Sequence, residues 1–374
     1  MARYLPSLAT ACYRQNAYTR NCVIGITSRA FTSTPPSSSS GENNNNNNDV
    51  SSSLSTSKAP KSTLSTILQS EHLDSATRAI GQVIFLNDTN SGRVVLASLA
   101  LGDPTLAACA ALGSITSTST SKFIGLDKQA WRGGLWGYNG ALIGCAVSVF
   151  GPSSLPFIVL STMVGAAATP VVSASLKSAV SMPQWTWSFN FVALTSLLRS
   201  RPLLNTASSS AESAVAIATP GFQDIALSPL TGISQIFVVN SHLTGAGIVA
   251  ATYMYSPKLA WHAVGGSLTG CLVGIMSGAD LADITNGLWG YNSALASMAV
   301  GTFFVHSRNT MILSATSAAA SASLFGAMQA VFGIYGAPCL TLPFCTVASA
   351  CYLLEGHIPG LKLAKEPHSP EKNG

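Results

Sequence analysis

Long apolar stretches dominate the chain from about residue 80 to residue 356, and Gly, Pro, Ser and Asn separate them. Charged side chains are almost absent from these stretches; between Gly133 and Leu198, for example, the only one is Lys177. Since a membrane-spanning helix needs about 20 mostly apolar residues, the pattern predicts roughly ten crossings, some of them short or broken. Alternation with a period of two is weak, which disfavours a transmembrane β-barrel. We therefore expect an all-α polytopic membrane protein.

The composition excludes two other common classes of chain. Of the 374 residues, 47% are hydrophobic and only 9% are charged, whereas soluble proteins carry about 25% charged residues. The mean hydropathy is +0.37. A soluble fold of this length needs more charge to cover its surface, and intrinsic disorder of the whole chain needs lower hydrophobicity. The formal net charge of +5 is small and partly N-terminal, so no nucleic-acid partner is expected.

The first 35 residues differ in composition from the rest of the chain. They hold four arginines, are rich in Ser, Thr and Ala, and precede the first acidic residue, Glu42. This is typical of a mitochondrial transit peptide, although an unstructured tail of a plasma-membrane protein fits equally well. The two alternatives place the protein in the mitochondrial inner membrane or in the plasma membrane. The Ser-rich segment 34–66, with its run Asn43–Asn48, indicates disorder, so we expect a disordered extension over residues 1–75. A disordered C-terminal tail is expected over residues 357–374.

The apolar region repeats itself. Residues Gly134–Asn139, with the sequence GLWGYN, return as Gly287–Asn292, 153 positions later. Two shorter matches are Gln82–Phe85 with Gln235–Val238, at an offset of 153, and Trp185–Phe189 with Leu340–Phe344, at an offset of 155. Three matches in one order indicate two homologous halves, residues 78–200 and 225–356, joined by a linker over residues 201–224.

Internal duplication in a membrane protein is typical of transporters with a substrate site on the pseudo-symmetry axis. An odd number of crossings per half would invert one half relative to the other, and we estimate about five crossings in each. The third pair of matches lies in apolar stretches of about 16 residues, Gln184–Arg199 and Cys339–Glu355, which as helices would span only about 24 Å. We expect half-helices that reach the middle of the bilayer, where their ends face a cavity.

Polar residues related by the repeat are candidates for lining such a cavity. Gln82 and Gln235 lie beside apolar segments, and each could instead form an ordinary hydrogen bond between helices. Thr186 and Thr341 lie in the half-helix stretches, although a membrane Thr usually bonds the carbonyl four residues before it. Their symmetric placement favours a pore-lining role for these residues and leaves the structural alternative open.

Apolar residues at helical spacing accompany these polar positions. They are Phe85, Tyr138 and Leu142 in the first half and Val238, Tyr291 and Leu295 in the second. Within each half the tyrosine and the leucine are four positions apart and therefore share one face of a helix. Such a stripe is normally part of a core, but in a channel it would form a narrow, flat, apolar slot.

Chemistry other than passive transport has little support in the sequence. Ion-coupled transporters usually carry a buried Asp, Glu or Lys in a crossing helix, whereas Asp280 and Asp283 lie by a predicted loop. The histidines show no metal spacing, the eight cysteines include no CxxC pair, and no Gly-rich phosphate loop is present. We therefore expect no enzymatic activity, no metal and no cofactor, and passive movement of a neutral solute.

The repeated motifs resemble those of the urea transporter family over about residues 78–356. The resemblance rests on the doubled GLWGYN block with Leu eight positions after its first Gly, on Gly81–Phe85 with Asn87, and on Pro338–Cys345. It implies a homotrimer in the lipid bilayer, in which each protomer has a pore between two inverted repeats of five helices and a half-helix. Urea would pass this pore in single file, without a cofactor or a coupling ion.

By motif match, the resemblance implies roles for ten residues. Gln82 and Gln235 would bind urea at the two mouths, and Thr186 and Thr341 would line the centre beside the carbonyls of the half-helices. The walls of the slot would be Phe85, Tyr138, Leu142, Val238, Tyr291 and Leu295.

The first half departs from the family pattern at two places. Ser188 stands where proline is usual, whereas Pro343 is present in the second half, and Asp88 and Thr89 replace the usual Asn-Pro pair. Two alternative functions remain open: a channel for another small neutral solute, such as ammonia, formamide or a short amide, and an inert membrane scaffold. Swelling assays with a panel of solutes distinguish them, because a scaffold passes none.

Overall fold

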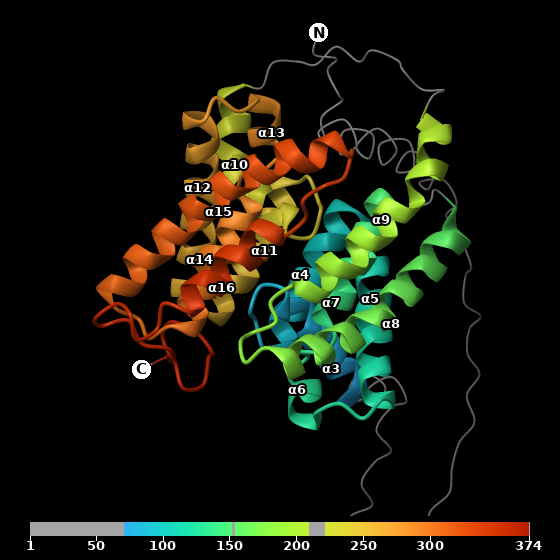
Figure 1. Ribbon diagram of the computed structural model, residues 1–374, viewed down its shortest axis with the longest axis horizontal. Helices are drawn as coiled ribbons and strands as arrows, with labels where there is room; N and C mark the ends of the chain where they lie inside the picture. The colour runs from blue at the N-terminus through green and yellow to red at the C-terminus, as the bar shows by residue number, and fades with distance from the viewer. Residues whose placement is uncertain (1–70, 152–153, 209–220, 374) are drawn as a thin grey trace, which may run out of the picture.

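In the computed structural model, which describes residues 71–151, 154–208 and 221–373, helices make up nearly all of the regular structure (Figure 1). The described helices are α3 (Glu71–Gln82), α4 (Thr89–Gly102), α5 (Pro104–Phe123), α6 (Lys128–Arg132), α7 (Tyr138–Phe150), α8 (Leu155–Ala179), α9 (Trp187–Ser208), α10 (Phe222–Gln235), α11 (His242–Tyr255), α12 (Pro257–Met276), α13 (Leu281–Thr285), α14 (Tyr291–Phe303), α15 (Arg308–Ile334) and α16 (Leu342–Tyr352). Among these residues the only β pairing is an isolated bridge between Phe304 and Leu363. The all-α class predicted from the sequence is confirmed.

Four consecutive helices return with the spacing of the sequence motifs. The bounds of α4 to α7 reappear as those of α11 to α14, each shifted by 153 positions. The starts of α5 and α12 also share their chemistry, because each begins with a proline, whose missing N–H is not needed in a first turn. Asp103 and Ser256 precede these prolines and accept hydrogen bonds from the first turns as N-caps. The two segments therefore contain helices of the same lengths in the same order.

Small residues let neighbouring helices approach closely. An added Cβ on Gly113 of α5 would come within 2.0 Å of the carbonyl oxygen of Gly140 in α7. In the second group, a Cβ on Gly270 of α12 would come within 2.2 Å of the carbonyl oxygen of Trp289, just before α14. Membrane helices associate largely through such close packing of backbones. These contacts provide a rigid frame for the helices that carry the site.

The two groups of helices share one buried apolar cluster. It includes Phe189 of α9, Phe237 after α10 and Phe344 of α16, none of which is more than 2% exposed. Figure 1 shows α3 to α9 (blue to green) beside α10 to α16 (yellow to red). Helix α4 contacts α11, and α9 contacts α16, across the junction between the groups. The candidate site lies at this junction.

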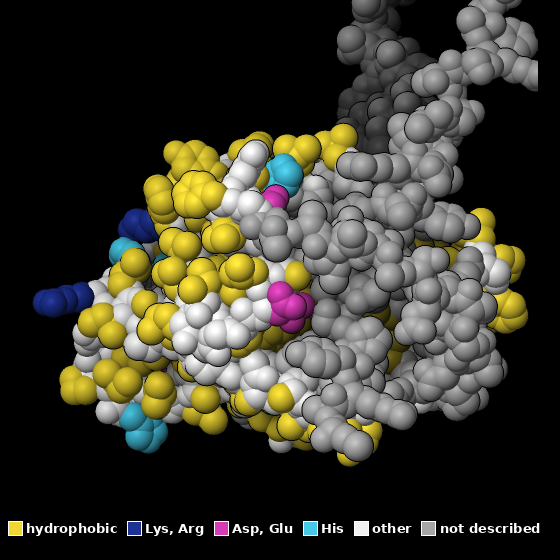
Figure 2. All heavy atoms as spheres, turned by 90° about the horizontal axis from the view of Figure 1, so that it is seen from above, with side chains coloured by type: hydrophobic (Ala, Val, Ile, Leu, Met, Phe, Trp, Pro, Cys, Tyr) yellow, Lys and Arg dark blue, Asp and Glu magenta, His cyan; other side chains and the backbone are white. Residues whose placement is uncertain are grey.

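Several helices suit a lipid environment. Helices α8, α12 and α15 are long enough and apolar enough to cross a bilayer, while α7, α16 and the segment Trp187–Leu198 of α9 are apolar but shorter. On the face drawn in Figure 2, apolar side chains are abundant and charged ones are few. The roughly ten crossings expected from the sequence stay a prediction.

The helix bounds differ from the expected segment boundaries. The extension over residues 1–75 lies almost wholly outside the described residues, and α3 begins at Glu71. Where a linker is expected over residues 201–224, α9 continues to Ser208 and α10 begins at Phe222. Both ends of that segment are therefore helical.

The C-terminal segment packs against helix ends instead of forming the disordered tail that the sequence predicts from residue 357. Glu371 accepts a hydrogen bond of 2.7 Å from the backbone nitrogen of Lys258 in the first turn of α12. The ring of His368 stacks on Tyr255 at the end of α11, with 5.3 Å between the ring centroids. Helix ends leave unpaired backbone groups, and polar side chains far along the chain satisfy them here. Composition alone does not reveal such partners.

Candidate functional site

The half-helix stretches expected from the sequence begin helices α9 and α16, whose first turns meet. Each helix is directly preceded by a threonine, Thr186 before α9 and Thr341 before α16. The two Oγ1 atoms lie 2.7 Å apart and share a hydrogen bond, and each residue is only 3% exposed. The threonines thus bond each other across the junction between the two groups of helices.

The proline missing from the first half does not displace the start of its helix. Pro343 lies in the first turn of α16. The corresponding Ser188 is fully buried in α9, and its Oγ accepts a hydrogen bond of 2.7 Å from Ser173 of α8. In α9 the first turn is therefore held by a hydrogen bond to a neighbouring helix. In α16 the proline ring fixes the backbone of the first turn instead.

Asn190 and Cys345 complete the contact between the threonines. The Asn190 amide nitrogen donates to Thr341 Oγ1 at 2.9 Å and to the carbonyl oxygen of Thr186 at 3.0 Å. The Asn190 Oδ1 accepts from the backbone nitrogen of Thr341 at 3.1 Å, and Cys345 Sγ lies 3.1 Å from Thr186 Oγ1. The centre is therefore a buried polar network without a charged group.

Two strained residues precede the threonines. Trp185 and Leu340 have φ angles of 43° and 49°, in the left-handed region that residues other than glycine rarely adopt. Their carbonyl oxygens accept hydrogen bonds from tyrosine hydroxyls, Trp185 from Tyr138, and Leu340 from Tyr291 at 2.7 Å. Asn292 also donates to the Leu340 carbonyl, at 3.1 Å. Strained backbone of this kind is concentrated at functional sites in proteins.

The two glutamines make equivalent hydrogen bonds. Gln82 Nε2 donates to the carbonyl oxygen of Gly133 at 2.8 Å, and Gln235 Nε2 donates to that of Asn286, also at 2.8 Å. Each amide nitrogen therefore bonds another segment of the chain, which is the structural alternative that the sequence analysis names for these glutamines. The same bond holds each glutamine at the end of its helix, α3 or α10.

A cavity of about 50 Å³ lies on the second-half side of the threonines. Its lining is Phe150, Phe189, Gln235, Ile236, Val238, Leu288, Tyr291, Phe325, Gln329, Pro338, Cys339, Leu340 and Thr341. Four of these, Gln235, Val238, Tyr291 and Thr341, are site residues expected from the sequence. The expected wall residues Leu142 and Leu295 do not line this cavity; each is 1% exposed within the shared apolar cluster, and their place in the slot stays a prediction. Since a cavity needs roughly 10–15 Å³ on this scale to hold one water, this cavity has room for a small solute.

Aromatic rings surround the corresponding position of the first half. Phe85 makes edge-to-face contacts with Trp185, Phe303 and Phe344, with centroid separations of 6.4, 6.2 and 6.4 Å. Phe85 has a φ of 66° and Val238, its counterpart, a φ of 61°. The structure therefore repeats the backbone conformation at the two ends of the site, but the side chains differ.

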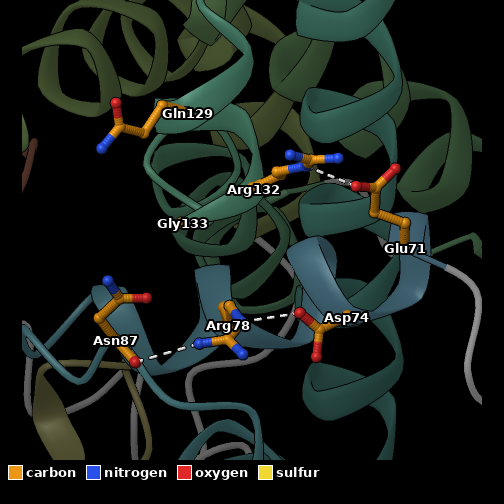
Figure 3. A pocket seen from close by; sticks show the side chains of 7 residues that line it. All are labelled: Glu71, Asp74, Arg78, Asn87, Gln129, Arg132 and Gly133. Atoms are coloured by element: carbon orange, nitrogen blue, oxygen red, sulfur yellow. Dashed lines mark hydrogen bonds and ion pairs between the residues drawn. The ribbon is translucent and has the colours of Figure 1, made fainter.

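A larger hollow of about 380 Å³ lies beside Gly133, the hydrogen-bond partner of Gln82 (Figure 3). It is lined by Glu71, Asp74, Arg78, Asn87, Gln129, Arg132 and Gly133, the last of which accepts the hydrogen bond from Gln82. Figure 3 shows two ion pairs on its wall: Arg78 Nε lies 2.7 Å from Asp74 Oδ2, and Arg132 Nε lies 2.5 Å from Glu71 Oε1. Because each arginine is paired, the charges of the hollow balance locally.

The structure adds residues that the sequence analysis did not single out. They are Trp185, Asn190, Phe303, Phe344 and Cys345. Trp185 and Phe344 lie inside matched segments of the repeat, so the mismatch of Trp185 with Leu340 was a usable signal. The contacts of Asn190, Phe303 and Cys345 could not be predicted, because they join segments far apart in the chain. Among the described residues, no group of three or more His, Cys, Asp or Glu is placed to hold a metal ion.

Comparison with known proteins agrees with the resemblance noted from the motifs. The family model described as urea transporter matches residues 73–356. Urea transporter 1 of Rattus norvegicus is 32% identical over 317 residues, which cover 80% of this chain and 82% of the relative. Urea transporter 1 of Ovis aries is 30% identical over 297 residues, covering 76% of this chain and 77% of the relative.

Proposed function

We propose that this chain, which belongs to the urea transporter family, moves urea passively through a narrow single-file pore. Membership of the family makes the chain a membrane transporter and not an enzyme. The path would lead from the hollow beside Gly133, past Phe85, between Thr186 and Thr341, and out through the cavity beside Gln235. The observation that carries this proposal is the cavity itself, which has an uncharged lining, has room for a small solute and ends on Thr341.

The chemistry along this path suits a neutral amide. Urea is planar, with four N–H donors and one acceptor oxygen. The hydroxyls of the two threonines can accept from its N–H groups, and the amide of Gln235 can hold it at the mouth. Each such bond replaces one bond to water, so urea loses its hydration stepwise. The cavity lining offers an ion no opposite charge, so an ion would lose its hydration without compensation.

The central hydrogen bond defines the step that urea has to make. Thr186 and Thr341 bond each other, and a molecule between them must separate the two hydroxyls. Urea can compensate both, since each hydroxyl can donate to or accept from the solute. The exchange of one neutral hydrogen bond for others costs little, because a net bond is worth roughly 1 kcal/mol. We propose that this exchange lets urea cross the centre without an energy source.

We extend the proposal to the arrangement of the chain in the membrane. Residues 78–200 and 225–356 would be inverted repeats of about five crossings and a half-helix each, and the shared spacing of α4–α7 and α11–α14 supports the duplication. Both threonines of the centre belong to one chain, which supports a separate pore in every protomer of a homotrimer.

The proposal is tested with the full chain purified and reconstituted into liposomes. Stopped-flow light scattering should report urea flux well above that of empty liposomes, saturable with urea and unaffected by sodium or proton gradients. Flux equal to that of empty liposomes would contradict urea transport, and flux that requires an ion gradient would contradict the passive mechanism. A panel with ammonia, formamide and acetamide tests the alternative solutes in the same preparation.

A further inference from the structure

The two ends of the proposed pore share a backbone conformation, but two aliphatic side chains at one end correspond to aromatic side chains at the other. At the second-half end, Phe150 and Phe189 line the cavity together with Val238 and Leu340. The residues related to Phe150 and Phe189 by the repeat are Phe303 and Phe344, so this pair of phenylalanines is kept at both ends. The residues related to Val238 and Leu340 are Phe85 and Trp185, which are larger and aromatic.

These two larger side chains belong to a packed group of rings. The ring centroid of Trp185 lies 4.9 Å from that of Phe303, 5.8 Å from Phe344 and 6.4 Å from Tyr352, all in edge-to-face arrangement. Such separations are those of rings in direct contact. Phe85 completes the group. The first-half end is therefore filled with rings where the second-half end is hollow.

Trp185 is the best held member of this group. Its indole nitrogen donates to Ser349 Oγ of α16 at 3.1 Å, and its carbonyl accepts from the Tyr138 hydroxyl. The residue is only 5% exposed and has a left-handed backbone, which leaves its side chain few alternative orientations. A ring fixed by its neighbours, its nitrogen and its backbone cannot move aside as easily as an aliphatic side chain.

We propose that Trp185 is a specificity-determining residue that makes the first-half end the narrow end of the pore. This inference rests on the proposed function, because it concerns the same path. Urea can pass edge-on between flat rings, but an N-methyl group adds bulk that the packed rings do not accommodate. The second-half end, with Leu340 at the matching position, imposes a weaker restriction on size. Discrimination against substituted ureas therefore depends on one end of the pore.

The test exchanges the residues that differ between the ends. Trp185→Leu places the second-half residue in the first half, and Leu340→Trp is the matched reverse exchange. Fluxes of urea, N-methylurea and N,N′-dimethylurea are measured for the wild type and both variants in the same liposomes. Because one methyl group in a tight apolar site changes rates roughly tenfold or more, Trp185→Leu should raise the N-methylurea to urea flux ratio about tenfold. Leu340→Trp should lower the flux of all three solutes, since it fills the cavity.

The flux ratio separates a role in specificity from a role in folding alone. A damaged fold would lower all fluxes together, whereas the proposal requires that the ratio change. If Trp185→Leu does not fold, Trp185→Phe keeps an aromatic ring and should raise the ratio by a smaller factor. Urea flux with an unchanged ratio in the folded variant would overturn the proposal. A wild type that passes no urea would instead overturn the proposed function, and this inference with it.

Discussion

Replacing Thr341 with valine tests the centre of the proposed pore with almost no change of shape. The hydroxyl of Thr341 bonds Thr186 Oγ1 at 2.7 Å and accepts from the Asn190 amide at 2.9 Å. Valine removes both bonds and leaves a buried hydroxyl and a buried N–H with one partner fewer. Asn190 keeps its bond to the carbonyl oxygen of Thr186, so its amide is not stranded. The substitution should therefore weaken the site without destroying it.

The magnitudes follow from the bonds that are lost. One neutral hydrogen bond contributes roughly 1 kcal/mol net, and a buried group left without a partner costs about 1–3 kcal/mol. Thr341→Val should thus lower the free energy of unfolding by about 2 kcal/mol. For a urea molecule at the centre, one acceptor is missing, which raises the barrier by about 1 kcal/mol and lowers urea permeability about fivefold. Stopped-flow light scattering measures the permeability, and thermal denaturation in detergent measures the stability.

A double-mutant cycle decides whether the two threonines act together. Thr186→Val and Thr341→Val each break the same central bond, so the double variant should be destabilised by about 1 kcal/mol less than the sum of the two. Additive losses of stability would contradict the hydrogen bond between the two hydroxyls. Unchanged urea permeability in Thr341→Val would remove Thr341 from the lining of the pore.

Two further predictions concern the backbone and the C-terminal segment. Val238→Asn should raise the free energy of unfolding by about 1 kcal/mol, and with it the thermal midpoint, because asparagine tolerates the φ of 61° that strains a β-branched residue. The control is Val239→Asn at the buried neighbouring position, which should lower the midpoint. A lower midpoint in both variants would contradict the strain at Val238. In the docked C-terminal segment, burial and the charge of Lys372 lower the pKa of His368. Burial alone would raise the pKa of Glu371, but its hydrogen bonds, such as that from the Lys258 backbone, outweigh burial and lower it. The C-terminal segment therefore binds more protons when it is released from the helix ends than when it is docked on them. Docking should weaken as the pH falls from about 6.5 and be lost as the pH falls through the folded pKa of Glu371. Hydrogen exchange of residues 357–373 measures docking, and protection that does not change with acid would contradict this prediction.

The repeat made a large part of the site predictable. The repeat singles out Thr186 and Thr341 because they occupy equivalent places in two short apolar stretches, and the two residues bond each other. The repeat singles out Tyr138 and Tyr291 in the same way, and each hydroxyl donates to the carbonyl of the residue before a central threonine. A duplicated sequence works like a comparison of two related proteins, because it marks positions whose surroundings are shared. Whether these residues line a pore stays a prediction.

The residues that escaped prediction are those whose contacts cross the repeat. Asn190 bonds Thr341, which lies 151 positions away, and no local pattern distinguishes it from other polar residues of a membrane helix. Leu142 and Leu295 have the same helical spacing from their tyrosines, yet neither lines the cavity that Tyr291 lines. Helical spacing shows which side chains share a face, and only tertiary packing decides whether that face meets a cavity or other helices.

The first turns of α9 and α16 also bear on why an uncharged solute suits this path. Two helix N-termini meet at Thr186 and Thr341, and each carries a partial positive charge that disfavours a cation between them. Such ends commonly bind anions through their unpaired N–H groups. In α16, however, Asn190 Oδ1 accepts from the backbone nitrogen of Thr341, and Asn292 Oδ1 accepts from that of Phe344, each at 3.1 Å. The asparagines thus occupy these two donors of α16, and the threonine hydroxyls that remain match a neutral molecule rich in N–H groups.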